Sequence, residues 1–170
     1  MSVKFMTRTA ILLALTIVFQ TLGRSLPLGQ ANQFITGSLV NACLVIAAAS
    51  VGLWGGLAVS LLSPFGAILT GAPIPLLFAP FIGVGNFILV LLFVLFKKQQ
   101  ILGVASGAVL KFGFLFASIN LFVNWMNLPG PKATAMIATF SWPQLVTALI
   151  GGAIALAVIK TIGKSLVKEA

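Results

Sequence analysis

The sequence predicts an all-α integral membrane protein, a six-helix transmembrane bundle with both termini in the cytoplasm. Three observations predict this class: 60% of the 170 residues are hydrophobic, 6% are charged, and long apolar runs follow one another along the chain. Soluble domains are about half apolar and about a quarter charged. A soluble body this small could not hide so much apolar surface, so the surrounding solvent must be lipid.

The chain contains six apolar segments, each about as long as a membrane helix needs to be. Together they are expected to form a single membrane domain, residues 1–170. Gly52, Gly55 and Gly56 mark a turn, residues 71–75 form a Pro-rich connector, and the polar run 97–100 and the loop 124–132 mark two further breaks. The expected spans are residues 5–23, 34–51, 53–70, 78–96, 101–123 and 141–162.

The distribution of basic residues predicts the orientation of these spans. With six spans, both termini share one side of the membrane with the second and fourth connections. The other side carries Arg24 and Lys132, and Lys111 falls within a span. Because cytoplasmic loops are enriched in Lys and Arg, the richer side is expected to be cytoplasmic. The basic residues on that side are Lys4, Arg8, Lys97, Lys98, Lys160, Lys164 and Lys168.

The charged residues exclude most enzyme classes. Ten Lys and Arg residues stand against a single acid, Glu169, and the chain has no His and no Tyr. Carboxylate pairs, catalytic triads and Cys/His metal sites therefore lack their residues. A basic balance can indicate nucleic-acid binding, but here the basic residues lie between apolar runs. We expect no catalytic residue, no metal and no cofactor, and the single Cys43 can form no internal disulfide.

Polar residues within reach of the predicted outer face form the main candidate site. Amides at membrane depth are costly unless they are paired, so they usually face the interior of a bundle. Each could serve interhelical hydrogen bonding, and the tryptophans an interfacial belt, but clustering on one side favours a ligand pocket. The candidate binding residues are Gln30, Asn32, Gln33, Thr36, Asn41, Asn86, Asn120, Asn124, Trp125 and Trp142, and Ser38, Asn127 and Gln144 belong to the same polar set.

The composition of this pocket constrains its ligand. No acid is present to face a cationic group, so cationic substrates such as thiamine are disfavoured. Amides, hydroxyls and indole rings suit a flat heteroaromatic molecule that needs stacking and a few hydrogen bonds.

Lys111 is a further candidate, because an ionised lysine deep in a span costs at least roughly 3 kcal/mol. It could extend to the interface, lose its proton, or be hydrogen-bonded by amides and carbonyls. It could also meet a negative group on a ligand or partner.

Small residues four apart allow helices to approach closely. This spacing occurs at Ala10 and Ala14, at Gly103 and Gly107, and at Gly151 and Ala155. Packing inside the bundle is the simplest role for each pair.

The chain resembles the substrate-binding S components of energy-coupling factor (ECF) vitamin transporters. The resemblance covers the whole chain in size, span count and orientation. Its best local motif is Ala10-x-x-x-Ala14, and the stretches 35–42 and Gly83-Val84-Gly85-Asn86 are similar to elements of the family's second and fourth helices.

This resemblance implies a binding protein of a prokaryotic cell membrane, with Ala10 and Ala14 as the docking face for a transmembrane coupling protein. Two ATPase partners would supply energy, since this chain has no phosphate-binding glycine loop. The expected substrate is a vitamin or precursor, with a neutral heterocycle of the cobalamin-precursor branch, dimethylbenzimidazole or alpha-ribazole, preferred. Riboflavin-like and pantothenate-like substrates stay open, and Lys111 would suit an anionic one.

Two other classes of function stay open. A self-contained secondary carrier or channel usually places acids or His at the membrane midplane and often has an inverted repeat, and neither is seen here. A structural or assembly protein of the membrane would need no ligand.

Overall fold

The computed structural model describes residues 2–25 and 31–166, with side chains as far as residue 161. The described residues form helices joined by short turns, without a strand. Gln30 and Lys168, and the side chain of Lys164, lie outside the described parts. The helices are α1 (Val3–Ser25), α2 (Ala31–Leu69), the 3-10 turn η1 (Leu76–Phe78), α3 (Ala79–Leu95), α4 (Gln100–Trp125), α5 (Gly130–Phe140) and α6 (Trp142–Leu166).

Five of the described helical stretches are long and apolar enough to cross a membrane, counting α2 as one stretch and α5 with α6 as another. Their outer surface is suited to lipid, because large apolar side chains are exposed all around it. Examples are Leu69, Trp54 and Leu121, which are 87%, 69% and 71% exposed. An exposed apolar surface of this extent marks a membrane or protein contact.

The 39-residue α2 is interrupted at Gly52, whose φ of 79° and ψ of −167° lie outside the helical region. Only glycine adopts such a conformation readily. The chain reverses there: a Cβ built on Gly56 would lie 3.5 Å from the Cα of Ala48, whereas these residues would stand about 12 Å apart along a straight helix. The sequence predicted this turn, but Gly55 and Gly56 belong to the helix that follows it.

The structure corrects the end of the expected loop over residues 124–132, because residues 130–132 begin a helix. This additional short helix, α5, leads into α6 at Ser141. Asn127, with a φ of 46°, lies in the turn between α4 and α5. Pro131 lies in the first turn of α5, where the absence of its N–H costs nothing. A proline that begins a helix was read from the sequence as part of a loop.

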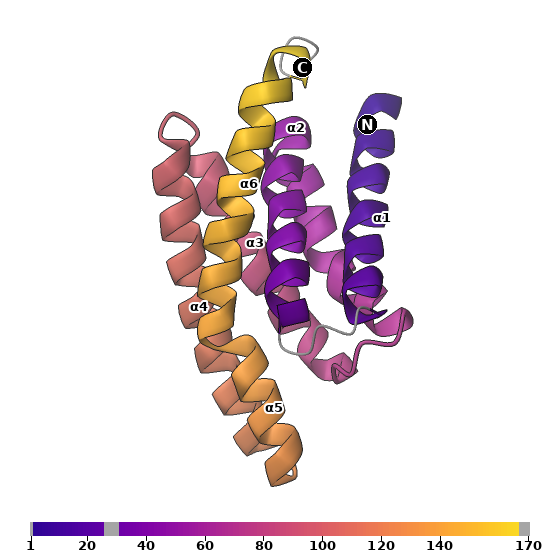
Figure 1. Ribbon diagram of the computed structural model, residues 1–170, viewed down its shortest axis with the longest axis vertical. Helices are drawn as coiled ribbons and strands as arrows, with labels where there is room; N and C mark the ends of the chain where they lie inside the picture. Colours follow the sequence, from indigo (N-terminus) through magenta and orange to yellow (C-terminus); the bar gives the residue numbers. More distant parts are fainter. Residues whose placement is uncertain (1, 26–30, 167–170) are drawn as a thin grey trace.

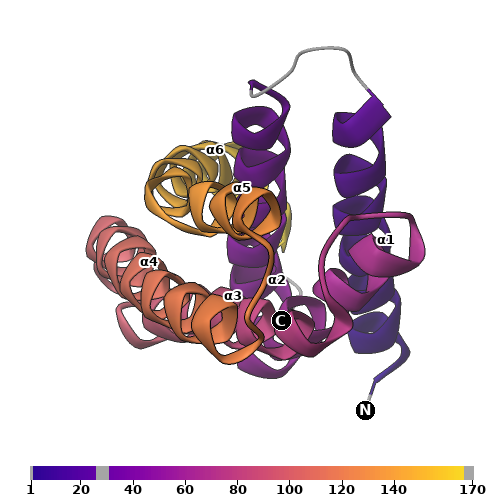
Figure 2. The ribbon, with the colours of Figure 1, turned by 90° about the horizontal axis from the view of Figure 1, so that it is seen from below.

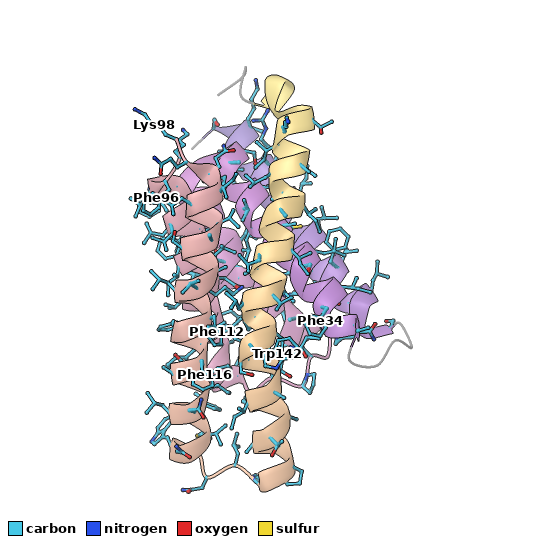
Figure 3. All side chains as sticks on the ribbon, turned by 60° about the vertical axis from the view of Figure 1, so that its left-hand side comes forward. Phe34, Phe96, Lys98, Phe112, Phe116 and Trp142 are labelled. Carbon is cyan, nitrogen blue, oxygen red and sulfur yellow. The ribbon has the colours of Figure 1, made fainter. Side chains whose placement is uncertain are left out.

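The helices pack side by side, with the start of α1 and the end of α6 at one end of the bundle and α5 at the other (Figure 1). We name these the terminal end and the cavity end. Lys98, between α3 and α4, lies at the terminal end (Figure 3). Seen from below, α1 stands at the edge, and it packs mainly against α2 (Figure 2).

Two apolar clusters hold this arrangement. The larger one joins α2, α3, α4 and α6 around residues such as Leu44, Leu89 and Ala148, each fully buried. The smaller one lies at the cavity end, where Phe78 contacts the rings of Phe122 and Phe140 at centroid distances of 5.0 Å each. Ring pairs at this separation are favourable. The second cluster therefore fixes α5 against η1 and α4.

Candidate ligand-binding cavity

A cavity of about 780 Å³ lies at the cavity end, between the end of α1, both arms of α2, the connector before η1, and helices α3 to α6. This volume is within the range of small-molecule sites, about 300–1,000 Å³. Six of the residues expected from the sequence line it: Asn32, Gln33, Thr36, Asn41, Asn86 and Lys111.

One of the most buried polar groups of the lining is the amino group of Lys111, on α4, whose side chain is 2% exposed. Its Nζ donates to Oδ1 of Asn41 at 2.5 Å and to Oδ1 of Asn86 at 2.8 Å. Asn41 lies on the first arm of α2 and Asn86 on α3. The sequence left several environments open for Lys111. In the structure two amide oxygens accept hydrogen bonds from it, and its side chain does not extend to the interface.

Asn41 is itself held in place. Its Nδ2 donates to the carbonyl oxygen of Gly37 at 2.9 Å and to Oγ1 of Thr147 at 3.3 Å. The Thr147 hydroxyl donates in turn to the carbonyl oxygen of Gln144. These bonds aim Oδ1 of Asn41 at Lys111, because the amide nitrogen is occupied on its other side.

A second set of bonds joins α5 to the cavity wall. The carbonyl oxygen of Thr139 accepts from Nε2 of Gln33 at 2.8 Å and from Nε2 of Gln144 at 3.2 Å. These bonds tie the start of α2 and the start of α6 to the last turn of α5. They satisfy a carbonyl that a helix end would otherwise leave without a partner.

The electrostatic character of the cavity is basic. Arg24 and Lys132 line it together with Lys111, and no described residue is an Asp or Glu. The guanidinium of Arg24 donates to the carbonyl oxygen and Oγ1 of Thr70, both at 2.8 Å, which ties α1 to the end of α2. Positive charges without acidic partners in a concave site attract anions.

The structure places four expected residues outside the cavity lining. Asn120 donates to the carbonyl oxygen of Phe116 on its own helix, and Asn124 is exposed. Trp125 and Trp142 are 72% and 58% exposed, and Trp142 lies beside Phe34 at 5.5 Å between ring centroids (Figure 3). Neither indole ring is part of the cavity lining.

Five polar residues of the lining were not predicted as binding residues from the sequence: Gln20, Arg24, Lys132, Thr139 and Thr147. Gln20 has a buried Oε1 with no hydrogen-bond partner among the described residues. Thr147 follows Gln144 by one helical turn, so it shares the face of a residue that the sequence did single out. That spacing was the available signal.

Ala10 and Ala14 are exposed on α1, away from the cavity lining. Gly151, by contrast, is an internal contact: a Cβ there would lie 2.7 Å from Cβ of Asn41 and 2.9 Å from the Ala42 nitrogen. The small residues thus differ in role, with Gly151 bringing α6 against α2.

Apolar helices that enclose a largely apolar cavity with basic and amide side chains in its wall define the class of the protein: a multi-pass membrane protein with a site for a small molecule. Residues 4–163 match the family model described as ECF transporter, substrate-specific component. The chain belongs to this family. No curated protein and no solved structure matches the chain.

Membership of this family defines the protein as a substrate-binding subunit of a transporter rather than an enzyme. It also implies association with the transmembrane and ATPase subunits of an ECF transporter, which hydrolyse the ATP, and with a small-molecule substrate.

Proposed function

We propose that this chain captures a vitamin-sized molecule from outside the cell in the cavity described above and delivers it inward with the help of ATPase partners. The observation that carries the proposal is the position of the cavity, at the end of the bundle opposite both termini. With the termini in the cytoplasm, this cavity faces the exterior.

The orientation and the six-span topology belong to this proposal. Lys4, Arg8, Lys97, Lys98 and Lys160 belong to segments at the terminal end, as the positive-inside rule requires of a cytoplasmic face. A straight helix of 39 residues would be about 58 Å long, against roughly 30 Å of hydrocarbon. The reversal at Gly52 therefore supports two spans in α2.

The exposed pair Ala10 and Ala14 is the proposed docking face for the coupling protein. Small side chains on an otherwise apolar, peripheral helix leave room for close approach by a partner helix. Neither residue lines the cavity, so this role is separable from substrate binding.

The cavity chemistry bears on the substrate. A neutral heterocycle such as dimethylbenzimidazole or alpha-ribazole was expected to stack on indole rings, but Trp125 and Trp142 are largely exposed and point elsewhere. The aromatic ring in the lining is that of Phe140, and three basic side chains, Arg24, Lys111 and Lys132, line the same cavity. These features favour a substrate with an acidic group over the neutral heterocycle.

Native mass spectrometry of the purified chain, released gently from detergent, tests the proposed function. We expect a copurified small molecule bound one to one. In cells, uptake of that molecule should require the coupling protein and the ATPases. Uptake by the chain alone would instead indicate a self-contained carrier, and a chain that binds nothing would indicate an assembly role.

A further inference from the structure

We infer that the occupant of the cavity is a small carboxylic acid, whose carboxylate binds the ammonium of Lys111 between Asn41 and Asn86. The inference rests on the proposed function, because it names the chemical class of the captured substrate.

Burial disfavours the charged form of Lys111, and an anion bound beside it stabilises that form. An ammonium has three protons to donate, and the described residues supply two acceptors, both of them neutral amide oxygens. The chain has one acid, Glu169, which lies outside the described residues. A buried charge is stable when an opposite charge pairs with it. The counter-charge is therefore expected to come with the ligand.

The geometry of the site fits one carboxylate. Lys111 lies at the wall of the cavity, so its third proton can reach a ligand there. Since Oδ1 of Asn86 is engaged by Lys111, the Nδ2 group of the same amide serves as a second donor. An ammonium and an amide side by side match the two oxygens of a carboxylate, and bonds to an ionised acceptor are the stronger kind.

A purely structural role for Lys111 does not explain why a basic residue stands at this position and lines the cavity. A neutral glutamine could bridge the amides of α2 and α3 without burying a charge, and such a bridge would not need to line a cavity. Arg24 and Lys132 add two positive charges to the same lining, which raises the local concentration of anions.

Matched pairs of probes test the inference on the full chain in lipid nanodiscs. The acids are pantothenate, biotin and nicotinate, and their neutral counterparts are panthenol, biotinamide and nicotinamide. Calorimetry and thermal shift should show that at least one acid binds, with its neutral counterpart weaker by about 100-fold or more, the range expected when a buried charge loses its partner.

Two substitutions act on Lys111 in different ways. Lys111→Met removes the charge and should weaken binding of the acid by about 100-fold while bringing acid and neutral probe to similar affinities. Asn86→Asp supplies an internal counter-ion in nearly the same shape, so the protein should unfold at a higher temperature and yet lose the acid. Lys98→Met, the same change at the terminal end, should alter neither property.

Asn86→Asp keeps the test decisive if Lys111→Met does not fold. Acid binding that survives Asn86→Asp unchanged would overturn the inference, as would a neutral probe that binds as tightly as its acid. A copurified neutral molecule also overturns it but leaves the proposed function standing. If neither acids nor neutral probes bind and nothing copurifies, both fail.

Discussion

Nζ of Lys111 and Oδ1 of Asn41 lie 2.5 Å apart although the two residues are separated by 70 positions in the chain. This bond joins α4 to the first arm of α2 beneath the cavity. Its direction depends on Thr147, which accepts from the amide nitrogen of Asn41 on the opposite side. With the bond from Lys111 to Asn86 on α3, four helices therefore set the position of this one side chain.

Replacing Thr147 with valine should disturb this charge without removing it. The substitution deletes two hydrogen bonds, the one from Asn41 and the one to the Gln144 carbonyl, each worth about 1 kcal/mol, and it frees Asn41 to rotate. We expect the midpoint of thermal unfolding to fall slightly and ligand affinity to fall by about tenfold. Calorimetry checks the affinity. Thr161→Val, on an exposed part of the same helix, is the control, and an equal loss in that variant would argue against a positioning role for Thr147.

Replacing Gly151 with alanine should separate α6 from α2. The added Cβ would meet Asn41 and the Ala42 backbone, and backbone cannot move aside cheaply. We expect a destabilisation of about 1–3 kcal/mol, typical of overpacking. Thermal unfolding followed by tryptophan fluorescence measures it. Gly113→Ala, which meets nothing within 4 Å, should leave the unfolding midpoint unchanged or higher. Equal midpoints for the two variants would contradict the close contact.

Replacing Gly52 with alanine should also destabilise the protein, for a different reason. No atom lies within 4 Å of a Cβ at this position, so packing imposes no cost. The cost is conformational, about 1–3 kcal/mol, because an L-residue rarely adopts this φ and ψ. The same unfolding assay and the same Gly113→Ala control apply. A variant as stable as the wild type would show that the turn tolerates another conformation.

Replacing Ala10 or Ala14 with tryptophan should separate binding from transport. Both side chains are exposed and outside the cavity lining, so ligand affinity should be unchanged. A bulky indole should block close docking, and we expect uptake in cells with the complete transporter to fall below about a tenth of its normal rate. Val109→Trp, on an exposed face of α4, is the control for bulk at the lipid surface. Loss of binding in parallel with uptake would refute the assigned docking face.

The sequence was informative where a polar residue interrupts an apolar run. Asn41, Asn86 and Lys111 stand out because lipid makes such residues costly, and the structure brings these three together. Breaks in the apolar runs likewise identified the reversal at Gly52, because glycine and proline act on the local backbone.

The remaining residues could not be assigned because a helix that is apolar on all faces has no periodicity to show which face is inside. Asn120 has the same side chain as Asn41 and Asn86 but lies outside the cavity lining. Arg24 and Lys132 were counted for orientation, and their place in the lining depends on how α1 and α5 pack. The short helix α5 was missed because its initial Gly-Pro pair also suits a loop.

Helix α1 stands at the edge of the bundle and carries two different surfaces on one rigid body. Ala14 is exposed, while Gly23, nine residues and about 14 Å further along, belongs to the cavity wall. A partner protein that binds the exposed surface around Ala14 and tilts α1 would also move the part of the cavity wall at Gly23. Binding of a partner would then open the cavity directly through the movement of α1, without a rearrangement of the helices in the core.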